Sequence, residues 1–196
     1  MSQNSINYTA YVIGNGTSRK NIPLQKLKTL GSLYGCNGLY REMELDVLVA
    51  TDRGMAFEIE NSGYPKNNKF YTRKPNEKAG SLPIPNQWKG WSSGPVSLAL
   101  ALNNGHQKIF LIGHDFGSTD DIFNNCYAGT QNYRKVGSPA TYSGNWINQT
   151  KILLTTYVNA KIIRVAGKES ARAEKLKSIS NYSEMEIETF CASINI

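Results

Sequence analysis

The segment YVIGNGTSRKNIP, residues 11–23, decides the fold class, because an apolar run leads into a turn of small residues and then into a proline. We expect a buried strand over the apolar residues and a helix that begins near Asn21 and Pro23, since proline is favoured in the first turn of a helix. Phosphate groups often bind where a strand turns into a helix N-terminus. The first question is therefore whether the turn at residues 14–18 forms such a site.

Apolar residues alternate between strand-like and helix-like spacing along most of the chain. This spacing predicts strands at 9–14, 32–36, 45–52, 108–115 and 160–167. It predicts helices at 24–30, 94–105 and 145–159, a helical turn at 53–59, and a final helix with a Ser183–Glu186 capping box. Alternation of this kind predicts one α/β domain over residues 1–196, Rossmann-like, with a mostly parallel central sheet and helices on both faces.

Two segments lack regular spacing. Residues 61–90 hold four prolines, and only 69–73 has the composition of a strand. Residues 117–144 are rich in Gly, Asn and Tyr. Long connections of this kind are usually surface excursions or mobile lids, so we expect both segments to lie as loops over the carboxyl edge of the sheet.

Polar and small residues follow several of the expected strands, and ligands of parallel sheets bind beyond the carboxyl ends of strands. Gly14 and Gly16 permit close backbone approach, while Ser18 offers a hydroxyl. Asn37 could contact a base or ribose, or it could simply close a turn. At the start of the 94–105 helix, the residues Ser92, Ser93 and Gly94 could bind a carboxylate or phosphate, or a serine could merely cap the helix.

The pair His114–Asp115 ends another expected strand. The chain has two histidines, so a histidine-based metal centre is not expected. Asp52 and Asp115 could share a magnesium ion held mainly by substrate phosphates. Alternatively, Asp115 could be structural and accept hydrogen bonds from loop amides. The sequence leaves both readings open.

Composition limits the classes of partner. A net charge of +7 favours an anionic ligand such as a nucleotide or nucleotide-sugar. Nucleic acid is not the expected ligand, because basic and aromatic residues do not alternate in an RNA-binding pattern. We expect no membrane span and no signal peptide, and thus a cytoplasmic protein with reduced cysteines. A homo-oligomer is compatible with the sequence.

Two blocks together resemble a known family. VIGNGTSRKNIP…YGCNGLY and SSGPVSLALALNNGHQKIFLIGHDF, about half of the chain, are similar to the bacterial CMP-sialic-acid-dependent sialyltransferases of the Campylobacter type. The resemblance implies nucleotide contacts from Asn15, Ser18, Asn37, Ser93 and Gly94. It also implies two tyrosines near the phosphate, of which Tyr127 matches one, while Gly117 stands at the place of the other.

The same resemblance implies a general-base histidine after a Tyr-x-Gly triplet. Here Tyr142 and Gly144 are followed by Asn145, whose neutral amide cannot accept a proton. Sialyl transfer by the family mechanism is thus not expected, although nucleotide binding is. The blocks also resemble archaeal-type 6-hydroxymethylpterin pyrophosphokinases, which would imply Mg²⁺.

We therefore expect a nucleotide-binding protein, and most directly a glycosyltransferase-like enzyme that uses a nucleotide-sugar. The expected nucleotide-binding residues are Gly14, Asn15, Gly16, Ser18, Asn37, Asp52, Ser93 and Gly94. The expected catalytic residues are Asp115, Tyr127 and His114, with the base to be found among Asp115, Asp52 and His114. The alternatives are a Mg²⁺-dependent pyrophosphokinase and a non-catalytic protein, bacterial or viral, that captures or senses a nucleotide.

Overall fold

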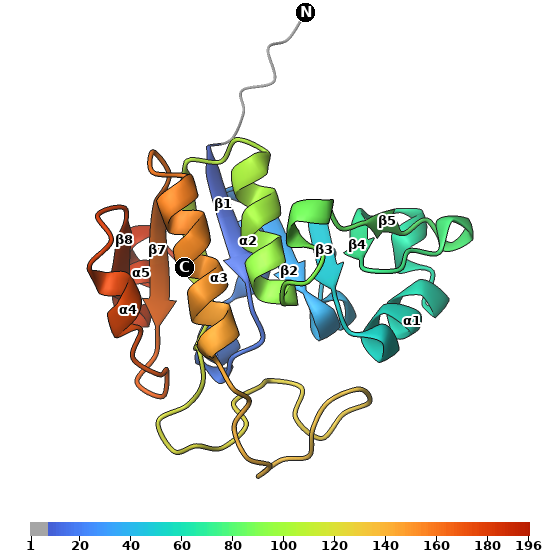
Figure 1. Cartoon of the computed structure of the whole chain (residues 1–196). Coiled ribbons are helices and arrows are strands. Elements are labelled where there is room, and N and C mark those ends of the chain that lie inside the picture. Colours follow the sequence, from blue (N-terminus) through green and yellow to red (C-terminus); the bar gives the residue numbers. More distant parts are fainter. Residues whose placement is uncertain (1–7) are drawn as a thin grey trace, which may run out of the picture.

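The computed structural model describes residues 8–196, which form one α/β domain built on a single parallel sheet (Figure 1). Within these residues the sheet has eight strands in the order β5-β4-β3-β2-β1-β6-β7-β8. The strands are β1 (Thr9–Ile13), β2 (Ser32–Cys36), β3 (Val47–Ala50), β4 (Phe70–Thr72), β5 (Leu82–Pro83), β6 (Lys108–Ile112), β7 (Lys161–Ala166) and β8 (Tyr182–Glu186). The predicted Rossmann-like class is confirmed.

The strand order places a topological switch between β1 and β6. The chain builds the sheet outward from β1 to β5, and then returns to add β6 on the other side of β1. Val12 is paired in register with Leu111 across this junction. Ligand crevices of open α/β sheets form at such switch points, beyond the carboxyl ends of the strands.

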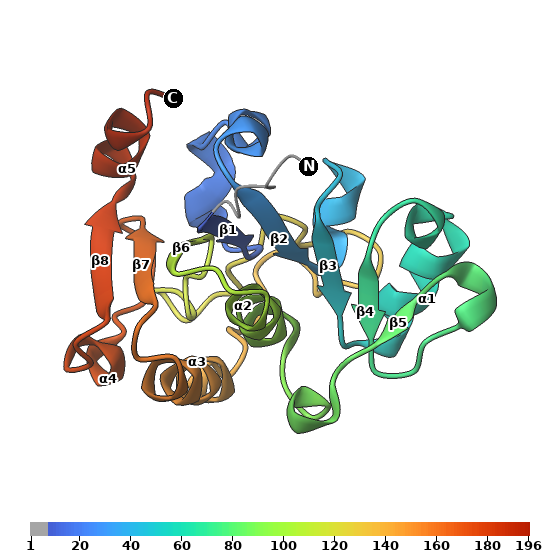
Figure 2. The same cartoon turned by 90° about the horizontal axis from the view of Figure 1, so that it is seen from above.

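Helices cover both faces of the sheet, which explains why its central strands are continuous apolar runs rather than alternating ones (Figure 2). One face is covered by α2 (Ser93–Asn103), α3 (Gly144–Thr156) and α4 (Glu174–Lys177). The other face is covered by α1 (Arg53–Asn61), α5 (Ile187–Ser193) and short 3-10 turns. The fully buried Leu98 of α2 and Ile59 of α1 represent the two core layers.

Two local details differ from what the sequence leads one to expect. The helix expected at 24–30 is present, but as a 3-10 helix (Leu24–Thr29). Its leucines are three residues apart, a spacing that also places side chains on one face of a helix with three residues per turn. The expected Ser183–Glu186 capping box lies within the edge strand β8, and α5 begins only after it, at Ile187.

The segment 61–90 is not a loop over the carboxyl edge. It supplies β4 and β5, which extend the sheet beyond β3, and Phe70 of β4 is fully buried in the core. The segment 117–144 does lie beyond the carboxyl ends of the strands, and it contains no helix or named strand before Gly144, where α3 begins (Figure 1). None of the helices within residues 8–196 combines the length and apolarity that a membrane crossing requires.

Candidate functional site

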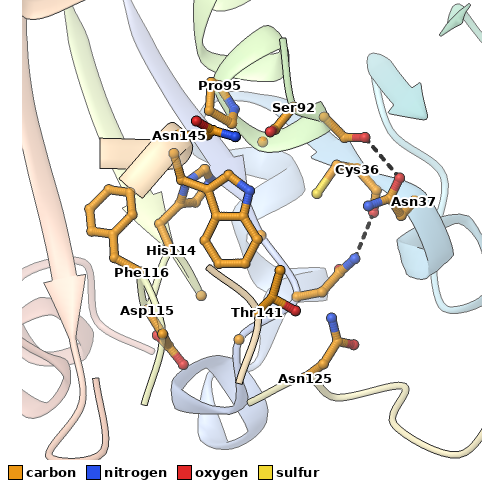
Figure 3. Close-up of a pocket in the computed structure, with 18 of the residues that line it drawn as sticks. Cys36, Asn37, Ser92, Pro95, His114, Asp115, Phe116, Asn125, Thr141 and Asn145 are labelled. Carbon is orange, nitrogen blue, oxygen red and sulfur yellow. Dashed lines mark hydrogen bonds between the residues drawn. The ribbon is translucent and has the colours of Figure 1, made fainter. Parts of the chain in front are cut away.

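A cavity of about 350 Å³ opens at the carboxyl edge, between the ends of β1, β2, β3 and β6, the N-terminus of α2 and the 117–144 segment (Figure 3). Most of the predicted site residues line it: Gly14, Asn15, Gly16, Asn37, Asp52, Ser93, Gly94, His114 and Asp115. A second cavity of about 310 Å³ lies beside it and shares part of its wall. We call these the first and the second cavity. Ser18 and Tyr127 line neither of them.

Four of the five backbone amides in the turn at residues 14–18 donate to the protein itself. Gly14 N donates to Ile112 O at 2.7 Å, and Gly16 N donates to Gly113 O at 2.9 Å. Thr17 N donates to Asn124 Oδ1 at 2.7 Å, and Ser18 N donates to Asp115. These four amides are therefore not available to a phosphate in this structure, and the turn instead joins β1 to the end of β6.

The glycines of this turn are required by packing. A Cβ atom on Gly14 would lie 2.5 Å from Gly113 O, and one on Gly16 would lie 2.3 Å from Asp115 Oδ2. Both distances are too short for any side chain, so the two glycines permit the close approach of β1 and β6.

Asn15 brings an unpaired acceptor to the cavity. The residue is buried, and its Nδ2 donates to Cys36 O at 3.1 Å and to Tyr133 Oη at 3.3 Å. Its Oδ1 is buried and has no partner within the described residues. A buried polar atom without a partner costs free energy, so it marks a place where a ligand N–H or O–H would bind favourably.

Ser93 connects three elements at the cavity wall. Its hydroxyl donates to Asn37 Oδ1 at 3.0 Å and accepts a hydrogen bond from Thr51 N at 3.0 Å. Asn37 has φ 52°, a left-handed conformation that asparagine tolerates better than most residues. No serine side chain caps α2. The helix N-terminus, which carries a partial positive charge, thus borders the cavity through Ser93 and Gly94.

The two candidate aspartates differ in their surroundings. Asp115 is buried, and its carboxylate accepts hydrogen bonds from Ser18 N at 3.1 Å, from Ser18 Oγ and from Ser170 Oγ at 3.0 Å. This geometry supports the interpretation that Asp115 has a structural role. Asp52 is exposed and lines both cavities. Residues 8–196 contain no group of three or more His, Cys, Asp and Glu side chains arranged to hold a metal ion.

His114 lies inside the first cavity with its imidazole neutral. The pKa of His114 is lowered to about 4, chiefly by burial and also by the nearby charge of Arg164, while the charge of Asp115 opposes the shift. The Nε2 atom is buried and has no partner within the described residues. His114 and Asp115 point in opposite directions from the end of β6 (Figure 3). The imidazole can therefore hydrogen-bond a ligand, but a pKa near 4 makes it a weak proton acceptor at neutral pH.

Tyr127 lies away from both cavities. Its hydroxyl donates to Glu42 and accepts a hydrogen bond from Arg19 Nη2 at 2.9 Å. Burial raises the pKa of Tyr127, and Glu42 raises it further, against the opposing effect of Arg19. The structure thus uses Tyr127 to attach the 117–144 segment to the body of the domain, rather than placing it against a ligand.

Arg164 is a positioning residue that the sequence reasoning missed. It is 1% exposed and donates to the backbone oxygens of His114 at 2.8 Å, Asp115 at 3.0 Å and Ala171 at 2.8 Å. It also pairs with Glu184 at 2.9 Å. The sequence feature that could have revealed Arg164 is its position as a charged residue in the middle of the apolar run KIIRVAG.

Further residues line the first cavity besides the predicted site residues. Asn145 lines the first cavity from the first turn of α3, beside Trp146. The cavity is also lined by Ser92, Gly117 and Tyr142, which had been named from the sequence. The lining residues that had not been expected are Cys36, Thr51, Arg73, Pro95, Gly113, Phe116, Asn124, Asn125 and Thr141. Phe116 has φ 53°, which is a strained conformation for a bulky residue and one that clusters at functional sites.

Comparisons with known proteins support the fold. No protein-family model and no curated protein matches the chain. Among solved structures, the fold is similar to that of an alpha-2,3-sialyltransferase from Campylobacter jejuni in its apo form, with a TM-score of 0.54 and 17% sequence identity. The similarity covers 86% of this chain and 79% of that one. At this identity the likeness establishes a shared α/β fold, and it agrees with the resemblance noted in the sequence.

Proposed function

We propose that this chain is a glycosyltransferase-like enzyme that binds a nucleotide-sugar in the first cavity. The observation that carries the proposal is a pair of buried, unpaired polar atoms, Asn15 Oδ1 and His114 Nε2, on residues that line a cavity at the switch between β1 and β6. Structures rarely leave such atoms unsatisfied without a functional reason. A fold similar to that of a sialyltransferase supports the choice of ligand class.

The anionic part of the ligand fits best at α2. The first amides of an α-helix have no partner within the helix, and this helix begins at Ser93 and Gly94 in the cavity wall. Arg73 lines the same cavity and adds a positive charge at its exposed rim, where it donates to Trp91 O at 2.9 Å. The amides of Gly14, Gly16, Thr17 and Ser18 are not part of this phosphate site, because the protein already uses them.

The base or ribose would then lie against the asparagines. Asn15 offers an acceptor, and Asn37, held by Ser93, borders the same space. His114 Nε2 offers a further hydrogen bond from below α2, where the ring is close enough that a Cβ on Gly94 would lie 3.2 Å from it. These groups can form hydrogen bonds with the polar edge of a base and with the hydroxyls of a ribose, which the nucleoside part of a donor provides.

A second candidate is a protein that captures a nucleotide without turnover. It is favoured by Asn145, which lines the first cavity at the position where the resembling family has its base, and whose amide cannot accept a proton. In this reading the same contacts bind the nucleotide, and no reaction follows.

Isothermal titration calorimetry separates these functions. The ligands are CMP, CMP-sialic acid, UDP-N-acetylglucosamine and ATP, each with Mg²⁺ and with EDTA, followed by an assay for nucleotide release. We expect a cytidine ligand to bind without metal, and Asn15→Ala to weaken it about tenfold, the loss of one hydrogen bond from a buried site. Asn67→Ala, an exposed asparagine outside both cavities, is the matched control and should leave the Kd unchanged.

The other results of the titration and the release assay distinguish the alternative functions. Binding without nucleotide release indicates capture, and Mg²⁺-dependent binding of ATP indicates a kinase-like protein. An unchanged Kd in Asn15→Ala, or no binding of any of the four ligands, contradicts the proposed site.

A further inference from the structure

Asp52 lies at the boundary of the two cavities. It lies two residues after the end of β3 and lines both cavities, together with Asn37, which follows the neighbouring strand β2. A group in this position can contact a ligand in the first cavity and a second molecule in the second cavity at the same time.

The side chain of Asp52 has no structural task that the structure shows. Asp52 occupies the N-cap position of α1, where aspartate usually accepts a hydrogen bond from the first turn, yet it makes no such bond. No donor within residues 8–196 is hydrogen-bonded to its carboxylate. Only its backbone oxygen is used, as the acceptor of Ala56 N at 2.9 Å. The carboxylate is therefore unbonded and belongs to an exposed residue that lines both cavities.

The other polar groups considered in the first cavity are poor proton acceptors. Asp115 is buried under three hydrogen bonds from Ser18 and Ser170. His114 is buried with its pKa lowered to about 4. Asn145 is a neutral amide. Among the side chains that line the first cavity, Asp52 is the remaining candidate for a general base.

The second cavity has the chemistry of a hydroxyl-rich ligand. Its wall contains the amide side chains of Asn125 and Asn132, the guanidinium of Arg134 and the ring of Trp146. Amides and guanidinium groups hydrogen-bond hydroxyls, and an aromatic ring packs against the apolar face of a sugar. The wall is thus suited to a saccharide acceptor.

We propose that Asp52 is the catalytic base of a transfer reaction and that the second cavity holds the saccharide acceptor. This inference rests on the proposed glycosyltransferase function. An acceptor hydroxyl oxygen bonds to the anomeric carbon of the donor sugar, while the bond from that carbon to the phosphate oxygen breaks. The electron pair of the broken bond stays on the nucleotide phosphate. The hydroxyl proton passes to the Asp52 carboxylate and from there to solvent.

The test uses CMP-N-acetylneuraminic acid as donor and lactose as acceptor probe, with CMP release measured both with and without lactose. Asp52→Asn keeps the shape of the side chain and removes its basicity. We expect it to lower kcat at least about 100-fold, the usual contribution of a general base, and to change the donor Kd by less than about threefold. Asp121→Asn, an exposed aspartate that lines neither cavity, is the matched control and should keep the wild-type rate.

Two further readouts separate a base from a merely structural group. The pH dependence of kcat should differ between the wild type and Asp52→Asn, because the amide of the variant cannot accept a proton. Added formate or azide should partly restore Asp52→Ala, because a small anion can occupy the vacated position.

The possible failures are distinguishable. If the wild-type chain releases CMP and Asp52→Asn releases it equally fast, the inference is overturned and the proposed function stands. If the donor binds but no CMP is released, the inference is overturned in favour of capture. If the donor does not bind, both proposals are overturned.

Discussion

Two aspartates of this chain look alike in sequence and differ in the folded protein. Asp52 ends the run VLVATD after β3, and Asp115 ends the run FLIGHD after β6. Both therefore lie at the carboxyl edge of the same sheet. Asp115 is 4% exposed and holds three hydrogen bonds, whereas Asp52 is exposed and its side chain has none within the described residues.

The difference comes from what crosses each strand end. The 16–18 turn and the segment around Ser170 both pass over the end of β6, and Arg164 fixes the backbone there from below. After β3 the chain turns directly into α1, and the adjoining space is open to both cavities. A polar residue after a parallel strand is thus placed at the edge by topology, but its neighbours decide whether it supports the fold or faces a ligand.

The largest loss of stability should come from removing the buried carboxylate of Asp115. Asp115→Ala leaves Ser18 N and two hydroxyls without an acceptor in a buried place, so we expect the free energy of unfolding to fall by about 3 kcal/mol. Urea denaturation monitored by circular dichroism measures it. A loss below about 1 kcal/mol would show that Asp115 is not the structural member of the pair.

A smaller effect should appear as pH is lowered toward 5. His114 binds a proton in the unfolded chain near its ordinary pKa of about 6.5, but in the folded protein only near 4. Its contribution to stability is therefore present above pH 6.5 and is lost as the pH falls toward 4. We expect a loss of about 2 kcal/mol between pH 7 and pH 5, measured by urea denaturation at each pH.

The variant His114→Gln provides the comparison for this pH series. Its free energy of unfolding should vary less between pH 7 and pH 5 than that of the wild type, whatever its absolute stability. The series stops at pH 5 so that most carboxylates remain ionised. Equal slopes in the two proteins would mean that His114 is not buried in its neutral form.

The smallest effect is expected at the exposed aspartate. Asp52→Ala removes a side chain with no hydrogen bond to the described chain, so the free energy of unfolding should change by less than about 0.5 kcal/mol. The same denaturation assay measures it beside Asp115→Ala. A loss as large as that of Asp115→Ala would erase the distinction between the two residues.

Much of the fold follows from sequence spacing. The buried strands around the β1–β6 switch have continuous apolar runs, and this alone places Asn15, Asn37, Asp52 and His114 at one edge. The edge strand β5 could not be predicted, because it is two residues long and includes a proline, whereas residues 69–73 had the composition of its neighbour β4.

The details of the site depend on contacts between distant parts of the chain. Ser18 meets Asp115 across 97 residues, and Arg19 meets Tyr127 across 108. No local pattern reports such pairs, so the sequence could not show that four of the 14–18 amides are occupied or that Tyr127 is bonded to Glu42. Arg164 differs, because a charged residue within an apolar strand already indicates contacts with polar groups elsewhere in the chain.

A crystal structure of the chain with CMP tests most directly whether the edge between β1 and β6 is a nucleotide site. We predict that CMP binds in the first cavity. A donor nitrogen or oxygen of CMP should lie within hydrogen-bond distance of Asn15 Oδ1, and the phosphate should lie at the amides of Ser93 and Gly94. CMP bound at another surface, or an empty first cavity at saturating CMP, would contradict this assignment.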